Sequence, residues 1–587
     1  MDGSQALDVA RYYQGVGSLL PEIVLGAGAT FLLLFETFAK PAPGGRRAGL
    51  IAAGVLALAL VASVLVAGQR ATAFSGMVVV DPFVDFFRVL SCIAGLLGVA
   101  LALRSDEIDA ALRPEYYCLF LALVLGMILM ASASDLLMAF IAVELMSLMS
   151  YVLAGLRRHD RRASEAALKY VVYGGAASGV MLVGFSLLYG LTGHTQFSLI
   201  NQVVVEYGRE VARSGLADPT KLLHMPVALT TGMVLSFAGF AYKIAAVPLH
   251  MWSPDVYEGA PTPFTAFLST GPKAAGFALL TRFFVVGFSD AAQFDQNLLT
   301  DISALPWLIL VIVVSMATMT VGNLAAIGQS NIKRFLAYSS IAHAGYALIG
   351  LAAFSKTGAS SVLLYMAIYV LMNIGTFYAV IWVREQTGSE LINDYQGLGH
   401  RAPLVGITMT LFFVSLTGLP PLAGFIAKYK LFAAALERAF GFETASRCAP
   451  AVMEHAEILD KLACTFGGSG MFYALGTLAV VNSAISLYYY FRVVKKMFLE
   501  KPENPAPIPV DGLSKVVLVG VSVLLLWFGI FPTALEAQSD KAIEFHRPTL
   551  AEVQPSLTPS LAAKQLPAAT TAEVTPTTPA APAPAAQ

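Results

Sequence analysis

Long apolar blocks, separated by short polar connections, run along almost the whole chain. A bilayer core needs about 20 apolar residues per helix, and blocks of that length recur up to about residue 535. They are continuous, unlike the alternating segments of about ten residues that outer-membrane barrel strands show. The pattern therefore predicts an all-α, polytopic membrane protein with about fourteen transmembrane helices. We expect them at 17–39, 49–68, 84–104, 115–131, 135–156, 166–190, 226–247, 262–287, 306–327, 332–354, 359–383, 403–436, 471–494 and 514–532.

Composition excludes several classes of protein. The 587 residues are 57% hydrophobic and only 13% charged, whereas an ordinary soluble domain carries about 25% charged residues. The net charge of −1 provides no basic surface for a polyanion. We therefore exclude a soluble enzyme, a nucleic-acid binder and a disordered scaffold.

The cysteines and glycines show no cofactor motif. None of the four cysteines has the spacing of a zinc or iron–sulfur site, and no Rossmann or P-loop glycine motif is present. We expect no redox cofactor, metal or nucleotide in this chain. Cys448 and Cys464 fall in a predicted extracytoplasmic loop at 437–470, where they either form a disulfide or remain two free thiols.

The basic residues predict an orientation. An even number of spans places both termini on one side of the membrane. The tight basic clusters, Arg46–Arg47, Arg157–Arg162, Lys333–Arg334 and Arg492–Lys501, all fall in odd-numbered connections. Basic connections stay in the cytoplasm, so both termini are predicted to be periplasmic.

A few charged residues lie inside the predicted spans, where a charge costs about 2.5–3.5 kcal/mol on insertion scales. Glu144 follows Asp135 by nine residues, about 13 Å along its helix, and is either a polar link between helices or a proton or ion site. Lys169 follows a basic loop by one turn and either joins a proton path or marks the helix end. Arg282 lies near a span end, and we expect its side chain to extend to the membrane surface.

Two proline breaks each lie beside a deep lysine. Lys243 precedes Pro248 by five residues, and Lys428 follows Pro420 and Pro421 by a turn or two. Proline within a span frees backbone carbonyls, and transporters build midplane sites at such breaks. The second break comes about five spans after the first, which predicts two inverted five-helix repeats, each with a broken helix.

Other titratable side chains lie near these breaks. Lys273 is well inside a span. His250 directly follows the first break, and His343 lies nearly mid-span among small and hydroxyl residues; each is either a relay group or a hydrogen-bonded core histidine. Lys430, two residues from Lys428, points to another face and is expected to be peripheral.

Such a row of residues suits proton transfer. Burial favours the neutral form of a lysine or a glutamate, and a nearby opposite charge favours the charged form. Bringing Glu144 and Lys243 together would hold both charged, and separating them would let Lys243 release its proton. A conformational or electrostatic change could thus move protons without a cofactor in this chain.

Four segments carry a family resemblance: KIAAVPLHMWSPDVYEGAPTP, GPKAAGF, NIKRFLAYSSIAHAGYALIG and LTGLPPLAGFIAKYKLF. They resemble the proton-pumping membrane subunits of respiratory complex I and the related Mrp-type sodium/proton antiporter subunits. The resemblance covers roughly residues 15–535. WSPDVYEGAPTP and a lysine at position 428 look like the N-type subunits of bacterial NADH–quinone oxidoreductase.

The resemblance implies residue roles. Glu144 matches the family glutamate of the fifth core helix, and Lys243 matches its lysine partner on the broken seventh helix. Lys273 matches the connecting lysine of the eighth helix, Lys428 the exit-side lysine of the broken twelfth, and Lys169 looks like the sixth-helix lysine. The resemblance thus implies a proton-translocating set and a candidate relay set: Glu144, Lys243, Lys273 and Lys428, and Lys169, His250 and His343.

The resemblance also implies a function. The chain is expected to be a proton-translocating subunit of a translocase, NADH–quinone oxidoreductase, in the bacterial inner membrane. NADH, FMN, iron–sulfur clusters and quinone would belong to partner subunits, and the neighbours would be M-type and small K-, J- and A-type membrane subunits. The alternatives are an Mrp-type cation/proton antiporter subunit and a membrane scaffold without transport. A quinone-binding enzyme has little support because the chain lacks a redox centre.

The predicted organisation has five parts. They are N-terminal transmembrane helices (1–114), a first antiporter-like five-helix repeat (115–287), a second repeat that includes the loop (306–494), a C-terminal transmembrane helix (495–535) and a disordered Pro/Ala-rich tail (550–587).

Overall fold

The computed structural model describes residues 15–39, 45–213, 219–289, 294, 307–444, 469–502 and 506–549. It is almost entirely helical, and twelve of the described helices are long and apolar enough to cross a membrane. The all-α fold class is therefore confirmed. Cys448, Cys464 and the 550–587 tail lie outside the described residues.

The first half of the chain contains α-helices, two 3₁₀ turns and one hairpin. In chain order these are η1 (Val16–Leu19), α2 (Leu20–Phe38), α3 (Arg46–Leu65), β1 (Ala71–Ala73), β2 (Val78–Val80), α4 (Pro82–Arg104), η3 (Ala110–Leu112), α5 (Arg113–Ser132), α6 (Leu136–Ala154), α7 (Arg161–Thr192), α8 (Phe197–Arg213), α9 (Pro219–Ile244), α10 (Trp252–Gly259), α11 (Thr262–Leu268) and α12 (Gly271–Phe288). Strands β1 and β2 pair antiparallel, with Thr72 opposite Val79.

The second half has a similar make-up without strands among its described residues. It contains α14 (Trp307–Ile327), α15 (Ile332–Ala353), α16 (Lys356–Thr387), η5 (Ile392–Tyr395), α17 (Leu398–Arg401), α18 (Pro403–Thr417), α19 (Ala423–Thr444), α22 (Ser469–Leu499), α23 (Gly512–Ile530) and α24 (Thr533–Ala542).

The expected count of about fourteen spans is not confirmed, because two of the predicted blocks are interrupted. The block at 262–287 is divided into α11 and α12, and the block at 403–436 is divided into α18 and α19. The predicted loop at 437–470 is also shorter than expected, since α19 continues to Thr444. The region predicted as a connection after residue 190 contains a helix, α8.

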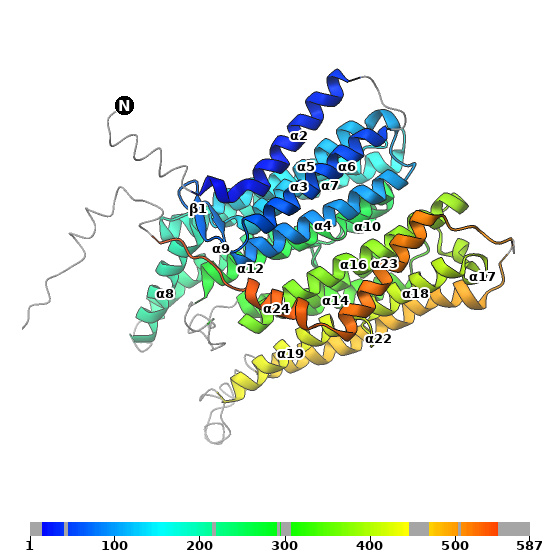
Figure 1. Ribbon diagram of the computed structural model, residues 1–587. Helices are drawn as coiled ribbons and strands as arrows, with labels where there is room; N and C mark the ends of the chain where they lie inside the picture. The colour runs from blue at the N-terminus through cyan, green and yellow to red at the C-terminus, as the bar shows by residue number, and fades with distance from the viewer. Residues whose placement is uncertain are drawn as a thin grey trace, which may run out of the picture.

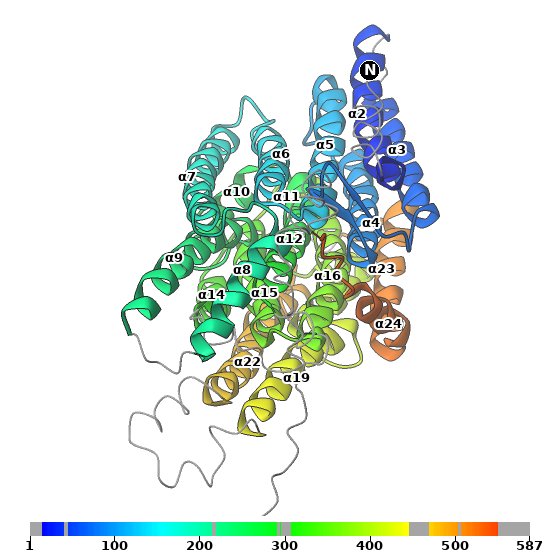
Figure 2. The same ribbon diagram turned by 90° about the vertical axis from the view of Figure 1, so that its left-hand side faces the viewer.

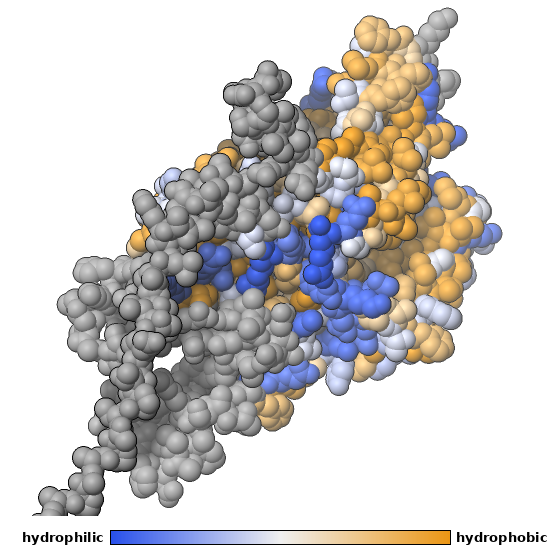
Figure 3. All heavy atoms as spheres, turned by 60° about the vertical axis from the view of Figure 1, so that its left-hand side comes forward, coloured by the Kyte–Doolittle hydropathy of each residue, from blue (hydrophilic) through white to orange (hydrophobic). Residues whose placement is uncertain are grey.

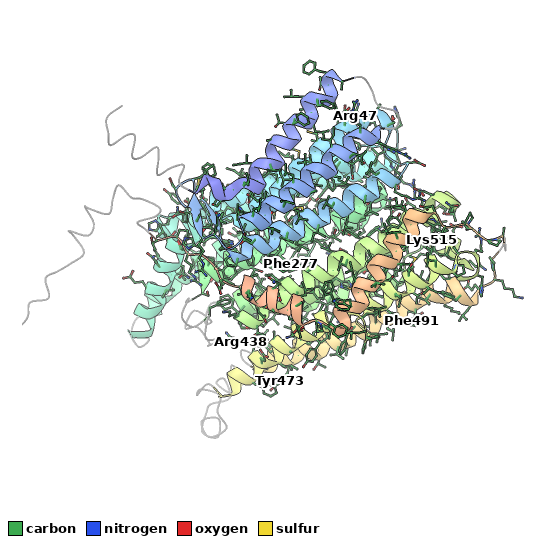
Figure 4. All side chains as sticks on the ribbon, in the orientation of Figure 1. Arg47, Phe277, Arg438, Tyr473, Phe491 and Lys515 are labelled. Carbon is green, nitrogen blue, oxygen red and sulfur yellow. The ribbon has the colours of Figure 1, made fainter. Side chains whose placement is uncertain are left out.

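The long helices run side by side in two groups, with the N-terminal helices forming one group and α14 to α23 the other (Figures 1 and 2). Arg47 and Lys515 lie at one end of this array, and Arg438 and Tyr473 lie toward the other (Figure 4). Apolar residues gather on the right-hand side of the face shown in Figure 3, beside a band of polar residues. Large apolar side chains are exposed on α3 as well, such as Leu58, which is 58% exposed. Such a surface suits contact with lipid.

Glycine allows two central helices to approach closely. A Cβ at Gly322 of α14 would collide with the backbone of Ala342, and a Cβ at Gly345 of α15 would collide with the backbone of Met319. Small residues at such crossings let helix backbones touch in a membrane, where packing drives association. The contact fixes α15, which is almost completely buried.

A fully buried ion pair joins α4 to α12. The Arg282 guanidinium donates two hydrogen bonds of 2.8 Å to the Asp81 carboxylate, and both side chains are 0% exposed. Arg282 also donates to the carbonyl of Ala131 at 2.7 Å and lies over the ring of Phe83. The expectation that Arg282 reaches the membrane surface is therefore wrong, because a buried partner from a distant segment satisfies its charge.

Charged residues tie the helix ends together where α4 and α16 finish and α15 begins. Glu107 pairs with Arg157 at 3.2 Å and with Arg384 at 3.0 Å. Glu390 pairs with Lys333 at 3.0 Å. Burial alone would raise the pKa of the Glu390 carboxyl, but Lys333, Asn331 and Arg384 together outweigh it and hold that pKa below its ordinary value. The Glu390 carboxyl therefore stays ionised at neutral pH.

We expect Arg282→Met to lower the free energy of unfolding by about 3–5 kcal/mol, because it leaves the Asp81 carboxylate buried and unpaired. Arg47→Met is the matched control: Arg47 pairs with Glu36 but is 32% exposed, so its loss should cost at most about 1 kcal/mol. Thermal unfolding of the detergent-purified variants measures both. Equal losses would contradict a dominant role for the buried pair.

Candidate functional site

The first helix break follows Lys243 directly. α9 ends at Ile244, Ala245 takes a left-handed conformation with φ 57°, and Val247–Pro248 is a cis peptide. The freed Val247 N–H donates to the Thr318 hydroxyl of α14 at 3.0 Å. Proline and the left-handed residue end the helix here, and a hydroxyl from a neighbouring helix satisfies the exposed backbone.

Lys243 and Glu144 belong to one cluster, formed with Ser147 and Ser178. The Lys243 ammonium donates to the Ser147 hydroxyl and lies over the rings of Tyr151 and Tyr242 at 5.6 and 5.2 Å. Lys243 is 4% exposed.

Glu144 lies one turn before Ser147 on α6, and its carboxylate accepts a hydrogen bond from Ser178 of α7. It acts on Lys243 electrostatically, but no ion pair within 4 Å joins the two among the described side chains. The structure thus places the predicted partners in one cluster, with Lys243 bound to Ser147 and Glu144 bound to Ser178.

The second break positions Lys428. α18 ends at Thr417, Gly418 has φ +88°, and Pro420–Pro421 is a cis peptide before α19 begins at Ala423. The freed Thr417 carbonyl accepts hydrogen bonds from the Lys428 ammonium at 2.8 Å and from Ser483 at 2.9 Å. A cation is favoured at a helix C-terminus, so the broken end of α18 holds the lysine.

Lys273, near the start of α12, is 2% exposed and reaches α15. Its ammonium donates to the backbone carbonyl of Ser340 at 2.7 Å and to the Ser340 hydroxyl. The same hydroxyl accepts a hydrogen bond from Tyr369 of α16 at 2.8 Å. Ser340 therefore joins three helices through one side chain.

His343 continues this line toward Lys428. It is hydrogen-bonded to Tyr365, and its ring lies 5.2 Å from that of Tyr369 and 5.9 Å from that of Tyr346. The Lys428 ammonium lies 4.3 Å from the centre of the Tyr346 ring. We call the resulting set the central row: Lys273, Ser340, Tyr369, His343, Tyr346 and Lys428.

Lys169 lies apart from both sets. It is 36% exposed and pairs with Asp255 at 2.6 Å and with Glu165 at 2.7 Å. Arg334 of α15 shares Asp255 at 2.6 Å, and these charges line a polar cavity of about 210 Å³. Burial would raise the pKa of Asp255, but hydrogen bonds from Lys169 and Arg334 outweigh it and lower that pKa.

His250 and Lys430 lie at the edges of the breaks. His250 follows the first break and is half-buried, and its Nδ1 has no hydrogen-bond partner among the described residues. Lys430 is 36% exposed and pairs with Glu536 at 3.5 Å. In the described part of the chain, no three His, Cys, Asp or Glu side chains gather where a metal could bind.

The sequence did not predict the serine hydroxyls that hydrogen-bond to the buried lysines. Ser147 lies three residues after Glu144, and Ser340 lies three residues before His343, so in each case the two side chains share one helix face. A spacing of three residues from a candidate site residue could therefore have identified both serines. The tyrosines of α16, by contrast, come from the next helix, and only the packing of α16 against α15 brings them to Ser340 and His343.

Known proteins share this architecture. A family model described as "NADH:quinone oxidoreductase/Mrp antiporter, TM" matches residues 133–446. NADH-quinone oxidoreductase subunit N of Anaeromyxobacter sp. (strain Fw109-5) is 43% identical over 534 residues, covering 90% of this chain and 96% of that protein.

Two solved structures are also similar. A chain of respiratory complex I from Thermus thermophilus with bound aureothin is 30% identical with a TM-score of 0.64, covering 88% of this chain and 98% of that one. A chain of the Mrp complex from Dietzia sp. DQ12-45-1b is 20% identical with a TM-score of 0.70, covering 92% and 98% respectively, and shows a shared fold.

We expect Gly418→Ala to destabilise the protein more than Gly388→Ala does. Both glycines have positive φ, which costs an alanine roughly 1–2 kcal/mol. Only at position 418 would the added Cβ also meet the Lys428 side chain, at 2.7 Å, adding about 1–3 kcal/mol of overpacking. Thermal unfolding of the purified variants measures the difference, and equal midpoints would show that Gly418 does not position Lys428.

Proposed function

This chain belongs to the family of NADH-quinone oxidoreductase N subunits, and from that membership we propose that it translocates protons across the bacterial inner membrane. It does so as a subunit of a complex in which NADH-to-quinone electron transfer drives the pumping. The chain is multi-pass, with twelve described helices able to span a membrane.

One observation carries this proposal: buried charges and hydroxyl groups form a nearly continuous line through the helix array. The central row runs from Lys273 to Lys428 through hydrogen bonds and ring contacts. The Glu144–Lys243 cluster lies beside its start, since Gly276 of α12, one turn after Lys273, packs against Ile244 of α9. Buried ionisable residues in a membrane are costly, and proton relays are their best-attested use.

The local contacts suggest how protons move. Lys273 and Lys428 bind only neutral oxygens among the described residues, so each can give up its proton without leaving a carboxylate unpaired. Lys243 differs because Glu144 acts on it through space. Moving Glu144 toward Lys243 would favour the charged lysine, and moving it away would favour proton release toward Lys273.

The remaining assignments are also part of the proposal. Glu144, Lys243, Lys273 and Lys428 carry the proton, and His343 relays it between Lys273 and Lys428. His250, which follows the first break, and Lys169, whose charged cavity lies apart from the central row, complete the candidate relay set. Residues 115–287 and 306–494 form two inverted repeats, each of which contains one of the two breaks.

We further propose that both termini are periplasmic and that the redox chemistry lies elsewhere in the complex. The end of the helix array that holds Arg47 and Lys515 would then face the cytoplasm (Figure 4). NADH, FMN, iron–sulfur clusters and quinone would be bound by other subunits. M-type and small K-, J- and A-type subunits would flank this chain in the membrane.

An Mrp-type antiporter subunit is the second candidate, because a chain of an Mrp complex shares the fold with a TM-score of 0.70. Purification in mild detergent separates the two. A complex I subunit should co-purify with flavin and iron–sulfur absorbance and with NADH-oxidising activity. Retention of the chain in a colourless complex that exchanges sodium for protons would favour the antiporter.

We expect Lys243→Ala to abolish NADH-driven proton pumping and to slow quinone reduction, because tight coupling stalls both. Lys430→Ala, which removes an exposed lysine, is the matched control and should keep both activities. Pumping is followed in vesicles by a pH-sensitive dye, and assembly by the amount of intact complex. Normal pumping by Lys243→Ala with reduced assembly would instead support a scaffold.

A further inference from the structure

A second cavity lies outside the proton path, where α24 packs against α4 and α16 (Figure 2). Its volume of about 680 Å³ falls within the roughly 300–1,000 Å³ typical of ligand sites. Its wall is mainly apolar and includes Phe86, Val89 and Ile93 of α4, Ala367 of α16 and Leu535 of α24. We call it the α4–α24 cavity.

The α4–α24 cavity has a polar mouth and an apolar floor. On α4 its lining runs from Pro82, the first residue of the helix, to Ile93, a distance of about 16 Å at 1.5 Å per residue. Ala367 lies equally far, about 16 Å, from the start of α16. The cavity therefore extends from the helix ends well into the region of apolar spans.

Three charged side chains border the mouth, and two of them already have partners. Asp85 accepts hydrogen bonds from the Gly68 backbone at 2.8 Å and from Arg88 at 3.2 Å. Glu544 pairs with Arg70. Lys541 is exposed, and the described residues provide no ion pair for it. Asp85 shares Arg88 with Glu22, so Lys541 is the one charged group at the mouth that has no ion pair among the described residues.

We infer that the α4–α24 cavity binds a membrane glycerophospholipid, with one acyl chain along α4 and the phosphate beside Lys541. A hydrocarbon chain matches the apolar wall of the cavity, and a phosphate matches the unpaired ammonium of Lys541. Hydrocarbon fills the apolar floor, which no water would stabilise. The bound chain would support α24, the helix that follows the last span, against α4 and α16.

The test uses the whole purified complex loaded with a phosphatidylglycerol that carries a diazirine in its acyl chain. Exchange into detergent removes loosely held lipid before irradiation, and mass spectrometry locates the adducts. We expect an adduct in the segment of α4 between Val89 and Ile93. Absence of that adduct from the wild-type complex would overturn the assignment.

Filling the cavity tests where the lipid chain lies. Ile93→Trp should remove the α4 adduct. Val61→Trp, on the 54% exposed lipid-facing side of α3, is the matched control and should leave it unchanged. If Ile93→Trp fails to assemble, Ala367→Leu narrows the same cavity from the opposite wall. An α4 adduct that survives in an assembled Ile93→Trp or Ala367→Leu complex would contradict the site.

Changing the mouth tests the headgroup. Lys541→Gln should weaken retention of the probe by about two- to fivefold, the effect of losing an exposed ion pair, whereas Lys541→Arg should preserve it. A diazirine-bearing quinone that labels the same segment in place of the phospholipid would overturn the choice of ligand. So would a crosslink from position 541 to another polypeptide. None of these readouts depends on proton pumping, so they test the lipid separately from the proposed function.

Discussion

A bilayer provides almost no water to charged side chains or to backbone groups without hydrogen bonds, so a membrane-spanning chain must supply their partners itself. This constraint explains the buried ion pair of Asp81 and Arg282, in which each charged group finds its partner on another helix. It also explains why the backbone freed at Val247 and Thr417 is hydrogen-bonded by side chains of neighbouring segments.

The same constraint connects the helix breaks to the lysines. At the second break the Thr417 carbonyl needs a donor, and Lys428 provides it. At the first break α9 ends one residue after Lys243, whose ammonium finds a serine hydroxyl on α6. The broken end of α18 therefore gives the Lys428 ammonium a carbonyl acceptor, which an intact helix would use within its own backbone.

The sequence predicted the parts that depend on local pattern. Apolar block length predicted most spans, and proline predicted both breaks, at Pro248 and at Pro420. Two of the fourteen predicted blocks, 262–287 and 403–436, are each divided into two helices. The interruption in the first block, directly before Pro272 of α12, was not predicted because apolar residues continue on both sides of it. Arg282 was assigned to the surface because its position near a span end says nothing about Asp81, which lies about 200 residues away in sequence.

The sequence by itself determined the fold class, the location of the breaks and the buried lysines Lys243, Lys273 and Lys428, since burying a charge in an apolar block is costly wherever the block packs. The tertiary structure alone decided which of those charges meet. Ser340 contacts Lys273 of α12 and Tyr369 of α16 because packing, including the close approach of α14 to α15, brings these helices together. Hydrogen bonds act over about 3 Å, so the path depends on helix packing that no local pattern in the sequence specifies.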